Sequence, residues 1–413
     1  MWRLAWRNLW RNRTRTAILL TAVGFSYAMM LVWIGISGDM YHKMKRGAVE
    51  SAGGAVLVHG DGYWQAQSSD IVIEQPDRIR RAVERSRLVE ATISRVLING
   101  LLTSPRGNSP GRLTGILPEQ QRKLRSMSEY LVEGEFLSGE HEHPIVLGTG
   151  IVEELEVELG DKVVLTASDP DGELTRALFR LRGVLKTGAQ KIDDTLAFTT
   201  LRAAQDAVGM GDEIHQLGVL ADEEVETRRV AESVRRRLGG RAEGLEVLTW
   251  QEAMPELVGF IEIDSAMMYV YLVIIFIIVA FVIANTFLMS VMERVREFGL
   301  FSALGLNDRR IGELVLEETL LVAALAMAIG LGLGVTGHLL IDHYGIDIAV
   351  FGAEEIEISG ISFADRIIRS RISAVQWVVA SGGVLVTILS SAAYPAWKAT
   401  RLAPSKAMEF YEM

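Results

Sequence analysis

The sequence contains no cysteine, and this absence excludes disulfide bonds, iron–sulfur clusters and thiolate zinc sites. It also lacks the G-x-x-x-x-G-K-[ST] pattern of a phosphate-binding loop and contains no Gly-Lys dipeptide. The G-x-S-x-G and H-E-x-x-H patterns of hydrolases are absent too. The dense histidine cluster at residues 141–143 is followed by Pro144 and is interpreted as a solvated loop. We therefore expect no catalytic residue, no metal site and no cofactor in this chain.

The net charge of -10 comes with no basic stripe interleaved with aromatic residues, so nucleic-acid binding is not expected. Four stretches contain no Asp, Glu, Lys or Arg: residues 16–37, 266–292, 319–341 and 372–397. A hydrocarbon core of about 30 Å is crossed by roughly 20 helical residues, and each stretch exceeds this length. The sequence therefore predicts four transmembrane helices. The first stretch is too long for the apolar region of a cleaved signal peptide and is interpreted as an uncleaved anchor.

The distribution of arginine predicts the orientation, because Lys and Arg in short segments tend to stay on the cytoplasmic side. The first fifteen residues contain no acid and hold five arginines: Arg3, Arg7, Arg11, Arg13 and Arg15. Both termini and the short segment after the second span are thus expected inside. Two basic clusters on the expected outer side, at residues 43–46 and 366–371, disagree with the rule. We place the chain in the bacterial inner membrane as a multi-pass protein with cytoplasmic termini.

The expected fold is an α-helical membrane protein with four transmembrane helices plus a mixed α+β extracytoplasmic domain inserted between the first and second helices. The expected segments, in chain order, are a cytoplasmic interfacial amphipathic helix at 1–15, the first span at 16–37, the periplasmic domain at 38–265, the second span at 266–292, a cytoplasmic coupling helix at 293–311, the third span at 312–341, an outer loop at 342–371, the fourth span at 372–397 and a cytoplasmic tail at 398–413.

The N-terminal segment has the pattern of a helix that lies in the membrane interface. The large apolar side chains fall at helical spacing on one face: Trp2, Trp6, Leu9 and Trp10. Arginines occupy another face, so the indoles would lie at headgroup depth and the guanidinium groups would point to phosphate. The alternative is that this segment simply extends the first span.

Short β-branched runs, such as residues 55–58, alternate with helical patterns between the first two spans, which indicates a mixed α and β domain. A strand is predicted at 144–148, a helix at 149–159 and a second strand at 162–167. A βαβαβ-like run is predicted further on, with strands at 195–198, 214–220 and 245–249 and helices at 201–208 and 227–238.

The predicted spans contain few groups that could carry ions or protons. His338 lies near the outer end of the third span, and Asn285 is the notable polar residue of the second. A proton-driven carrier would be expected to show more ionisable groups within its spans. We expect Asn285 to make an interhelical hydrogen bond rather than to contact a substrate.

Residues 293–305 have the character of a helix that docks on a partner. Charged residues (Glu293, Arg294, Arg296 and Glu297) stand beside apolar ones (Phe298, Leu300, Phe301 and Leu304) that could seat in a groove of another protein. The remaining residues of the expected docking segment are Gly299, Ala303 and Gly305. The alternative is an amphipathic loop that lies on the membrane.

The order of parts, together with three local motifs, resembles the permeases of the MacB and FtsX superfamily of ABC transporters, and in detail the LolC and LolE lipoprotein-releasing branch. Residues 293–305 look like the family's inner coupling helix, although Ser302 stands where many relatives have Arg or Lys. Residues 394–408 resemble the closing signature, which has Pro-Ala, a basic residue and a later Pro. Residues 145–164 and 183–198 resemble the LolC and LolE outer domain, which is the weakest match because such modules are common.

The resemblance implies an ABC ATPase subunit dimer as partner, with ATP and Mg bound there rather than in this chain. It also implies a second permease copy or a homologous permease, and a periplasmic partner such as a lipoprotein chaperone, with the lipid bilayer around the spans. Seven of the fifteen methionines, which suit adaptable apolar surfaces, flank the outer ends of the first two spans. With four bulky neighbours they form a candidate lipid path: Met29, Met30, Trp33, Met40, Met44, Met254, Phe260, Ile263, Met267, Met268 and Tyr271. Ordinary packing between spans is the alternative.

The function expected from the resemblance is that of a permease subunit that transmits ATPase work across the membrane and extracts or releases lipoproteins. Two alternatives stay open: efflux of peptides or drugs in the manner of MacB, and FtsX-like mechanical signalling to a cell-wall hydrolase. FtsX-like relatives have a smaller outer domain than residues 38–265, which weighs against signalling.

Overall fold

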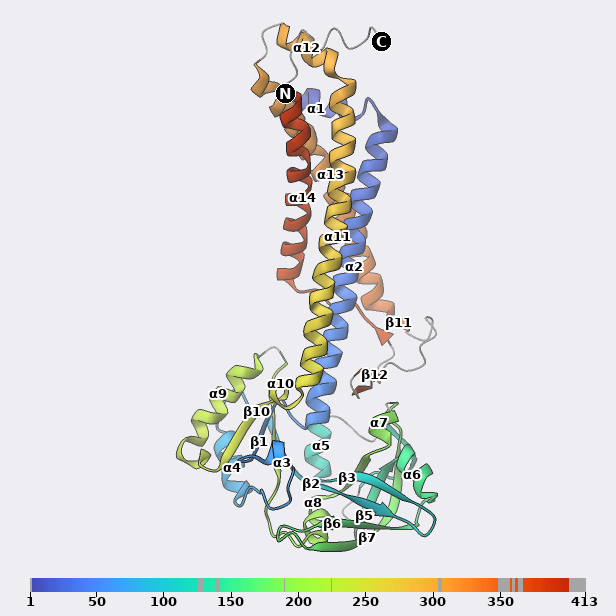
Figure 1. Ribbon diagram of the computed structural model, residues 1–413, viewed down its shortest axis with the longest axis vertical. Coiled ribbons are helices and arrows are strands. Elements are labelled where there is room, and N and C mark those ends of the chain that lie inside the picture. Colours follow the sequence, from blue (N-terminus) through green and yellow to red (C-terminus); the bar gives the residue numbers. More distant parts are fainter. Residues whose placement is uncertain are drawn as a thin grey trace. The chain divides into compact units, whose positions relative to one another are not determined.

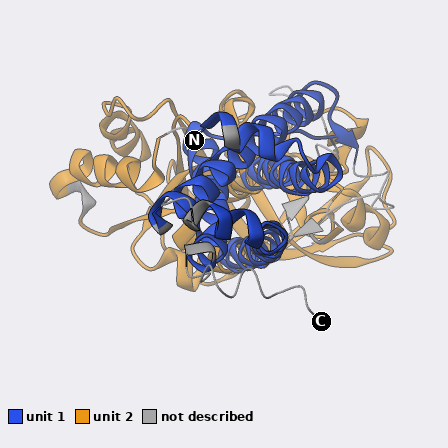
Figure 2. Cartoon of the chain, turned by 90° about the horizontal axis from the view of Figure 1, so that it is seen from above, with its two compact units in different colours: residues 1–41, 262–347, 367–413 blue, residues 42–261, 348–366 orange. Residues whose placement is uncertain are grey.

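The computed structural model describes residues 2–124, 130–137, 142–188, 190–223, 225–303, 307–347, 357–358, 361–362 and 367–400. The chain divides into two compact units, which Figure 2 shows in different colours. Unit 1 comprises residues 1–41, 262–347 and 367–413, and unit 2 comprises residues 42–261 and 348–366.

Unit 1 is a helical bundle whose long members run side by side (Figure 1). Four helices are long and apolar enough to cross a membrane: α2 (Arg13–Ala52), α11 (Pro255–Glu293), α13 (Asp308–Tyr344) and α14 (Ala374–Thr400). Shorter elements complete the described part of the unit: α1 (Trp2–Leu9), α12 (Val295–Ala303), β11 (Ile346–Asp347) and β14 (Ile367–Ile368). The prediction of four long apolar helices is confirmed.

Capping residues explain where two of these helices begin. The fourth span was expected from residue 372, but α14 starts at Ala374 because Ser373 and Gln376 form reciprocal hydrogen bonds between side chain and backbone. The coupling helix was expected over 293–311, yet α12 ends at Ala303 and α13 already begins at Asp308. The side chain of Asn307 accepts the backbone N–H of Arg309 there, so Asn307 is an N-cap.

The N-terminal segment is shorter than the helix expected over 1–15. Helix α1 ends at Leu9, residues 10–12 form a turn, and α2 begins at Arg13, so α1 is not an extension of the first span. The Thr16 hydroxyl donates to the Leu9 carbonyl and so pins this turn. Leu9 was expected beside the indoles, but it is buried in the bundle together with Ala5. Helix α1 therefore packs against the bundle through the side chains of Ala5 and Leu9.

Helices α2 and α13 pack closely because small residues face each other. A Cβ at Gly330 would collide with the Gly24 carbonyl and with the ring of Tyr27. Such close approach suits helices in lipid, where van der Waals contact rather than the hydrophobic effect holds them together. Helix α14 is tied to the same place, since the Tyr27 and Ser381 hydroxyls lie 2.5 Å apart.

Unit 2 contains a ten-stranded sheet in the order β10-β1-β9-β2-β3-β8-β5-β7-β4, with β6 paired to β2 and β7. The strands are β1 (Val56–Gly60), β2 (Ala91–Thr103), β3 (Asn108–Ile116), β4 (Leu131–Gly134), β5 (Pro144–Gly148), β6 (Lys162–Ser168), β7 (Leu174–Leu185), β8 (Leu196–Thr200), β9 (Gln216–Leu220) and β10 (Leu245–Thr249). The pair β12 (Glu357–Ile358) and β13 (Ile361–Ser362) is separate from this sheet.

The helices of unit 2 are mostly short. They are α3 (Tyr63–Ala66), α4 (Pro76–Val83), α5 (Pro118–Leu124), α6 (Thr149–Leu155), α7 (Gln190–Asp193), α8 (Leu201–Ala207), α9 (Thr227–Leu238), the 3-10 helix η2 (Gly239–Ala242) and α10 (Trp250–Ala253). The helix predicted over 149–159 ends early, at Leu155, because Glu156 adopts a left-handed backbone conformation. The mixed α and β character predicted for this region is confirmed.

The predicted βαβαβ-like run has the right elements but the wrong pairing. Strands β9 and β10 do not pair with each other, because β1 lies between them and is antiparallel to both. Strand β8 is farther away and pairs with β3 and β5. The observed strand is also shorter than the one predicted at 214–220. Ile214 forms only an isolated bridge with Ile73, and β9 starts at Gln216.

Within unit 2, the C-terminal end of α2 and the residues after it contact strand β9. The Gln216 side chain donates to the Ala52 carbonyl at 2.8 Å, and the Ala55 N–H donates to the Val219 carbonyl at 2.9 Å. A Cβ at Gly218 would collide with the Gly53 carbonyl, so only glycine permits this close approach. Because β1 follows directly, the α2 backbone is fixed to the middle of the β10-β1-β9 group.

Helix α11 starts from the neighbouring strand. Thr249 and Glu252 form a capping box at the start of α10, and the Trp250 N–H donates to the Ala55 carbonyl at 3.0 Å. Pro255 then begins α11. The end of α2 and the start of α11 are therefore attached to adjacent strands, β1 and β10.

A buried aromatic stack lies beside β1 in unit 2. The Tyr63 ring stacks on His59 and on His215, with ring centroids 5.0 and 5.3 Å apart. His59 Nδ1 donates to the His215 carbonyl at 3.0 Å, and its Nε2 is buried without a partner in the described structure. Burial lowers the pKa of His59 to about 4 from its usual 6.5, so the ring is neutral when folded.

The pKa of His59 predicts that unit 2 loses stability in mild acid. The unfolded chain takes up a proton on His59 near pH 6.5 whereas the folded chain resists until about pH 4, so the free energy of unfolding falls as the pH drops through this window. The full effect is roughly 3 kcal/mol. Asparagine keeps a donor near the Nδ1 position but does not titrate. Thermal unfolding of the full chain in detergent should therefore depend less steeply on pH in His59→Asn, and equal slopes would contradict the assignment.

Candidate functional site

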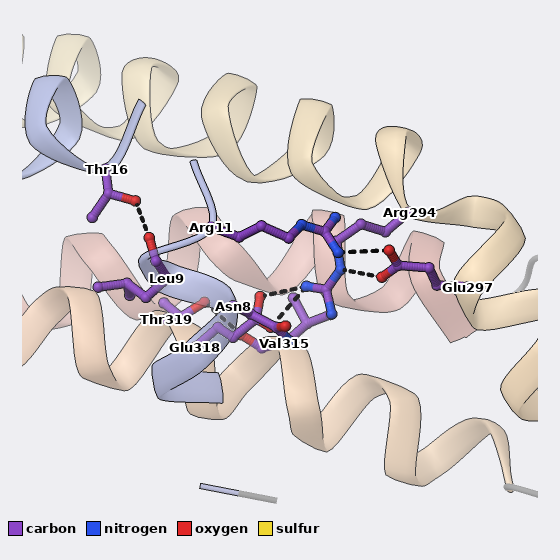
Figure 3. Close-up of polar contacts among 9 residues, drawn as sticks. All are labelled: Asn8, Leu9, Arg11, Thr16, Arg294, Glu297, Val315, Glu318 and Thr319. Atoms are coloured by element: carbon purple, nitrogen blue, oxygen red, sulfur yellow. Dashed lines mark hydrogen bonds and ion pairs between the residues drawn. The ribbon is translucent and has the colours of Figure 1, made fainter. Parts of the chain in front are cut away.

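The guanidinium of Arg294 forms the centre of a polar cluster at one end of unit 1 (Figure 3). Arg294 precedes α12 and is only 5% exposed. Its Nη1 donates to both carboxylate oxygens of Glu318 on α13, at 2.7 and 3.0 Å, and its Nε donates to Glu297 on α12 at 3.1 Å. A buried cation is costly unless it is paired and hydrogen-bonded, and here two carboxylates meet both needs.

The cluster also holds the N-terminal segment. The Asn8 side chain on α1 donates to Glu318 at 2.8 Å, and Arg11 in the following turn pairs with Glu297 at 2.6 Å. Arg15, in the first turn of α2, pairs with Glu293 at the end of α11. Five helices (α1, α2, α11, α12 and α13) are thus joined by side chains that lie far apart in the sequence.

Glu297 connects the two arginines that reach α12. Burial alone would raise the pKa of Glu297, but hydrogen bonds and charge from Arg11 and Arg294 outweigh it and lower that pKa below its usual value. The carboxylate is therefore charged at neutral pH. The guanidinium of Arg294 also lies 5.0 Å from the centre of the Phe298 ring, which adds a cation–π contact.

The expected docking segment separates into a buried and an exposed side. Phe298 is only 2% exposed and packs in the bundle core, and Arg294 and Gly299 are buried as well. The expectation that Phe298 seats in a partner's groove is wrong, because this side of α12 is occupied by its own chain. Arg296 and Leu300, four residues apart, face outward, and Leu300 is 60% exposed.

Other residues of the expected docking segment have these positions. Glu293 is exposed at the end of α11, and Glu297 is half-buried in the cluster. Phe301 and Ala303 lie within α12. Leu304 and Gly305 lie outside the described residues, as do residues 401–408 of the expected closing signature.

Comparisons with known proteins bear on the same region. The family described as "FtsX-like permease C-terminal" matches residues 269–404, which include α12 and its connections to α11, α13 and α14. The lipoprotein-releasing system transmembrane protein LolC of Neisseria meningitidis serogroup B is 26% identical over 218 residues, covering 50% of this chain and 51% of LolC. LolE of Haemophilus influenzae is 20% identical over 417 residues, covering 98% of both chains. Residues 269–404 thus match an FtsX-like permease domain, and the chain as a whole resembles the MacB/FtsX superfamily of ABC transporter permeases.

The similarity of this permease to its curated relatives is uneven along the chain. It spans about half the length of the Neisseria LolC and nearly the whole length of the Haemophilus LolE. Among solved structures, the periplasmic region of MacB from Actinobacillus actinomycetemcomitans is 15% identical with a TM-score of 0.35, and the match covers 48% of this chain and 89% of that one.

The candidate lipid path of the permease contains both buried and exposed side chains. Met30 and Met44 are buried, and Met40, Met254 and Met268 are partly buried. The exposed members are Met29, Trp33, Phe260, Ile263, Met267 and Tyr271. Within unit 1, the exposed members on α2 and α11 (Met29, Trp33, Ile263, Met267 and Tyr271) are between 49% and 64% exposed.

Two polar residues of the spans differ in their surroundings. Asn285 is exposed on α11, and the interhelical hydrogen bond expected for it is not formed within the described chain. His338 on α13 lies 2.7 Å from the Ser370 hydroxyl and edge-on to the Trp377 ring. The neighbouring segment is also fixed to α2, because the Arg371 N–H donates to the Gly35 carbonyl at 2.9 Å.

Two members of the polar cluster, Asn8 and Glu318, were not predicted. The uncharged stretch at 319–341 begins directly after Glu318, and only His338 and Asn285 were considered as polar residues of the spans. Because α13 begins at Asp308, Glu318 actually lies in its third turn and on its buried side. An acidic residue inside a helix that continues as a span is a signal of a buried partner, and it could have been recognised.

Proposed function

We propose that this permease transmits work from a separate ATPase across the bacterial inner membrane and uses it to extract or release lipoproteins. Its similarity to LolC and LolE, which are named as lipoprotein-releasing proteins, supports this cargo. The absence of a phosphate-binding loop in the sequence is the reason for assigning ATP and Mg to a partner chain. Two permease chains and two ATPase subunits would form the working assembly.

The observation that carries the proposal is the two-sided character of α12. Arg294 fixes one side to α13 and Glu297 fixes it to Arg11 of the N-terminal segment, while Arg296 and Leu300 are presented outward. A helix held in this way can pass a push from a partner to the spans without bending away. We assign the outward side, with its cation and its apolar side chain, to contact with the ATPase.

The proposed topology has both termini inside and the sheet-bearing region of residues 38–265 outside, inserted between the first and second spans. Part of the basic cluster at residues 43–46, which disagreed with the charge rule, has local partners within unit 2. Arg46 pairs with Glu223 at 3.1 Å, and Lys45 donates to the Glu223 carbonyl at 2.8 Å. These partners offer a structural reason for cations on the outer side.

The proposed path for the lipid anchor runs along the exposed apolar side chains at the outer ends of the first two spans. Moving an acyl chain into water costs about 0.8 kcal/mol per methylene, so an anchor is best handed along apolar surface. The path would use exposed members such as Met29, Trp33, Met267 and Tyr271. The buried Met30 and Met44 would pack beneath the exposed side chains of this path.

The proposal is tested by changing the outward side of α12. Leu300→Glu should place a charge in the apolar contact with the ATPase, so the ATPase should no longer co-purify and release of a labelled triacylated lipoprotein from proteoliposomes should fall to background. Leu300→Met keeps the apolar volume and should behave as the unmodified chain does. The measurements are quantitative mass spectrometry of the purified complex and the amount of soluble lipoprotein after addition of ATP.

Distinct outcomes would argue against distinct parts of the proposal. An ATPase that remains bound to Leu300→Glu with full activity would remove α12 as the docking element. A complex that couples normally but releases no lipoprotein from the membrane would remove the proposed cargo and favour efflux or signalling.

A further inference from the structure

The outward face of α1 carries both cations and indoles. Arg3 and Arg7 are exposed, and neither has an ion-pair or hydrogen-bond partner within the described part of the chain. Beside them lie the exposed rings of Trp2, Trp6 and Trp10, of which the last two touch edge to face at 5.9 Å. Tryptophan at headgroup depth together with unpaired arginine is the side-chain pattern that favours an anionic lipid surface.

The opposite side of α1 is firmly connected. Ala5 and Leu9 are buried in the core of unit 1, and Asn8 donates to Glu318 on α13. A helix of eight residues is too short to be stable alone in water, so its position depends on these contacts and on whatever its outward face meets.

A continuous chain of polar contacts leads from α1 to the coupling helix. Asn8 and Arg294 share the carboxylate of Glu318, and Arg294 and Arg11 share the carboxylate of Glu297 (Figure 3). Because each carboxylate serves two donors from different elements, displacing α1 would remove one donor from both. The orientation of α12 therefore depends on whether α1 is docked.

We propose that α1 binds anionic phospholipid headgroups through Arg3 and Arg7, and that docking of α1 on the membrane orders the coupling helix through the Glu318, Arg294 and Glu297 contacts. This rests on the proposed function of α12, and it makes coupling to the ATPase dependent on lipid charge. The ligand is the phosphate of a lipid and not free phosphate, because the indoles beside the two arginines need an apolar layer to enter.

The test measures hydrogen–deuterium exchange of the full chain in nanodiscs made of phosphatidylcholine alone or mixed equally with phosphatidylglycerol. Each arginine near an anionic surface strengthens association by about fivefold, so the amides of α1 should exchange up to about 25-fold more slowly in the anionic discs. The amides of α12 should slow as well. In Arg3→Gln/Arg7→Gln, both helices should exchange equally in the two lipids.

A matched control and a relay variant separate the two parts of the proposal. Arg309→Gln/Arg310→Gln removes the same charge from exposed positions at the start of α13 and should keep the lipid response. Glu297→Gln/Glu318→Gln removes both carboxylates that join the N-terminal segment to Arg294 and α12, so it should leave the lipid response of α1 but abolish that of α12. The exchange measurement needs neither ATPase nor cargo. The lipid proposal can therefore fail while the proposed function stands, and the reverse is also true.

Three results would overturn the proposal. Exchange of α1 that does not depend on lipid charge would remove the binding face. A response in neutral discs to added inorganic phosphate, equal to the response to anionic lipid, would show a free anion site instead. A lipid response of α12 that persists in Glu297→Gln/Glu318→Gln would remove the relay.

Discussion

Replacing Arg294 with glutamine is expected to detach the coupling helix from α13 and to abolish ATP-driven work. The change leaves the buried carboxylate of Glu318 with Asn8 alone and removes one of the two cations that hold Glu297. Breaking a buried ion pair by removing one partner costs about 3–5 kcal/mol, because a charge is left uncompensated. The melting temperature of the purified chain should fall, and ATP-dependent release should be lost.

A double substitution distinguishes coupling from mere stability. Replacing a buried ion pair with apolar residues of similar volume is often neutral or stabilising. Arg294→Met/Glu318→Met should therefore recover most of the melting temperature lost in the single variant. It should not recover release, because Glu297 would still lack Arg294 and Asn8 would lack the carboxylate of Glu318. Recovery of both properties would show that the cluster only stabilises the bundle, and full release by Arg294→Gln would show that it is not needed.

Arg294→Lys provides the graded comparison. Lysine keeps the charge but is a point donor, whereas the guanidinium fork reaches Glu318 and Glu297 at once and also lies against the Phe298 ring. An intermediate loss of release is expected. The order of the three variants thus reports how much of the effect comes from geometry and how much from charge.

Much of the architecture could be predicted from the sequence, because it depends on local patterns. Three of the four apolar stretches fall within helices and the fourth does so from Ala374 onward, and strands such as Pro144–Gly148 and Leu245–Thr249 have the predicted bounds. Pairing was not predictable in the same way. Nothing local to β9 and β10 indicates that β1, from the other end of the domain, inserts between them. Only the packing of the whole sheet decides this order.

The sequence alone did not indicate which side of the expected docking segment faces outward. The segment around Phe298 was found from its mixture of charged and apolar residues, yet such a pattern does not say which side faces a partner. Contacts with residues distant in sequence determine which side faces inward. Arg294 pairs with the buried Glu318, and Phe298 packs in the core of the bundle. The same holds for Leu9, whose helical spacing matches the indoles although its side chain packs inside.

The second large effect is expected at Gly218, where the end of α2 lies on the sheet of unit 2. A Cβ at this position would collide with the Gly53 carbonyl and come close to the Gly54 backbone, in the connection between α2 and β1. Overpacking of this kind costs about 1–3 kcal/mol and shifts the backbone. Backbone atoms cannot move aside as a flexible side chain can, so the connection itself must give way.

We expect α2 and α11 to carry the work of the ATPase to the sheet, because they attach to the adjacent strands β1 and β10. Gly218→Ala should then leave ATPase binding and ATP hydrolysis intact while release of lipoprotein falls at least tenfold, a loss of about 1.4 kcal/mol in coupling. Gly240→Ala is the control, since a Cβ there meets nothing within 4 Å. If Gly218→Ala released lipoprotein at the rate of the control, work would not reach the sheet through the contact between Gly218 and the α2–β1 connection.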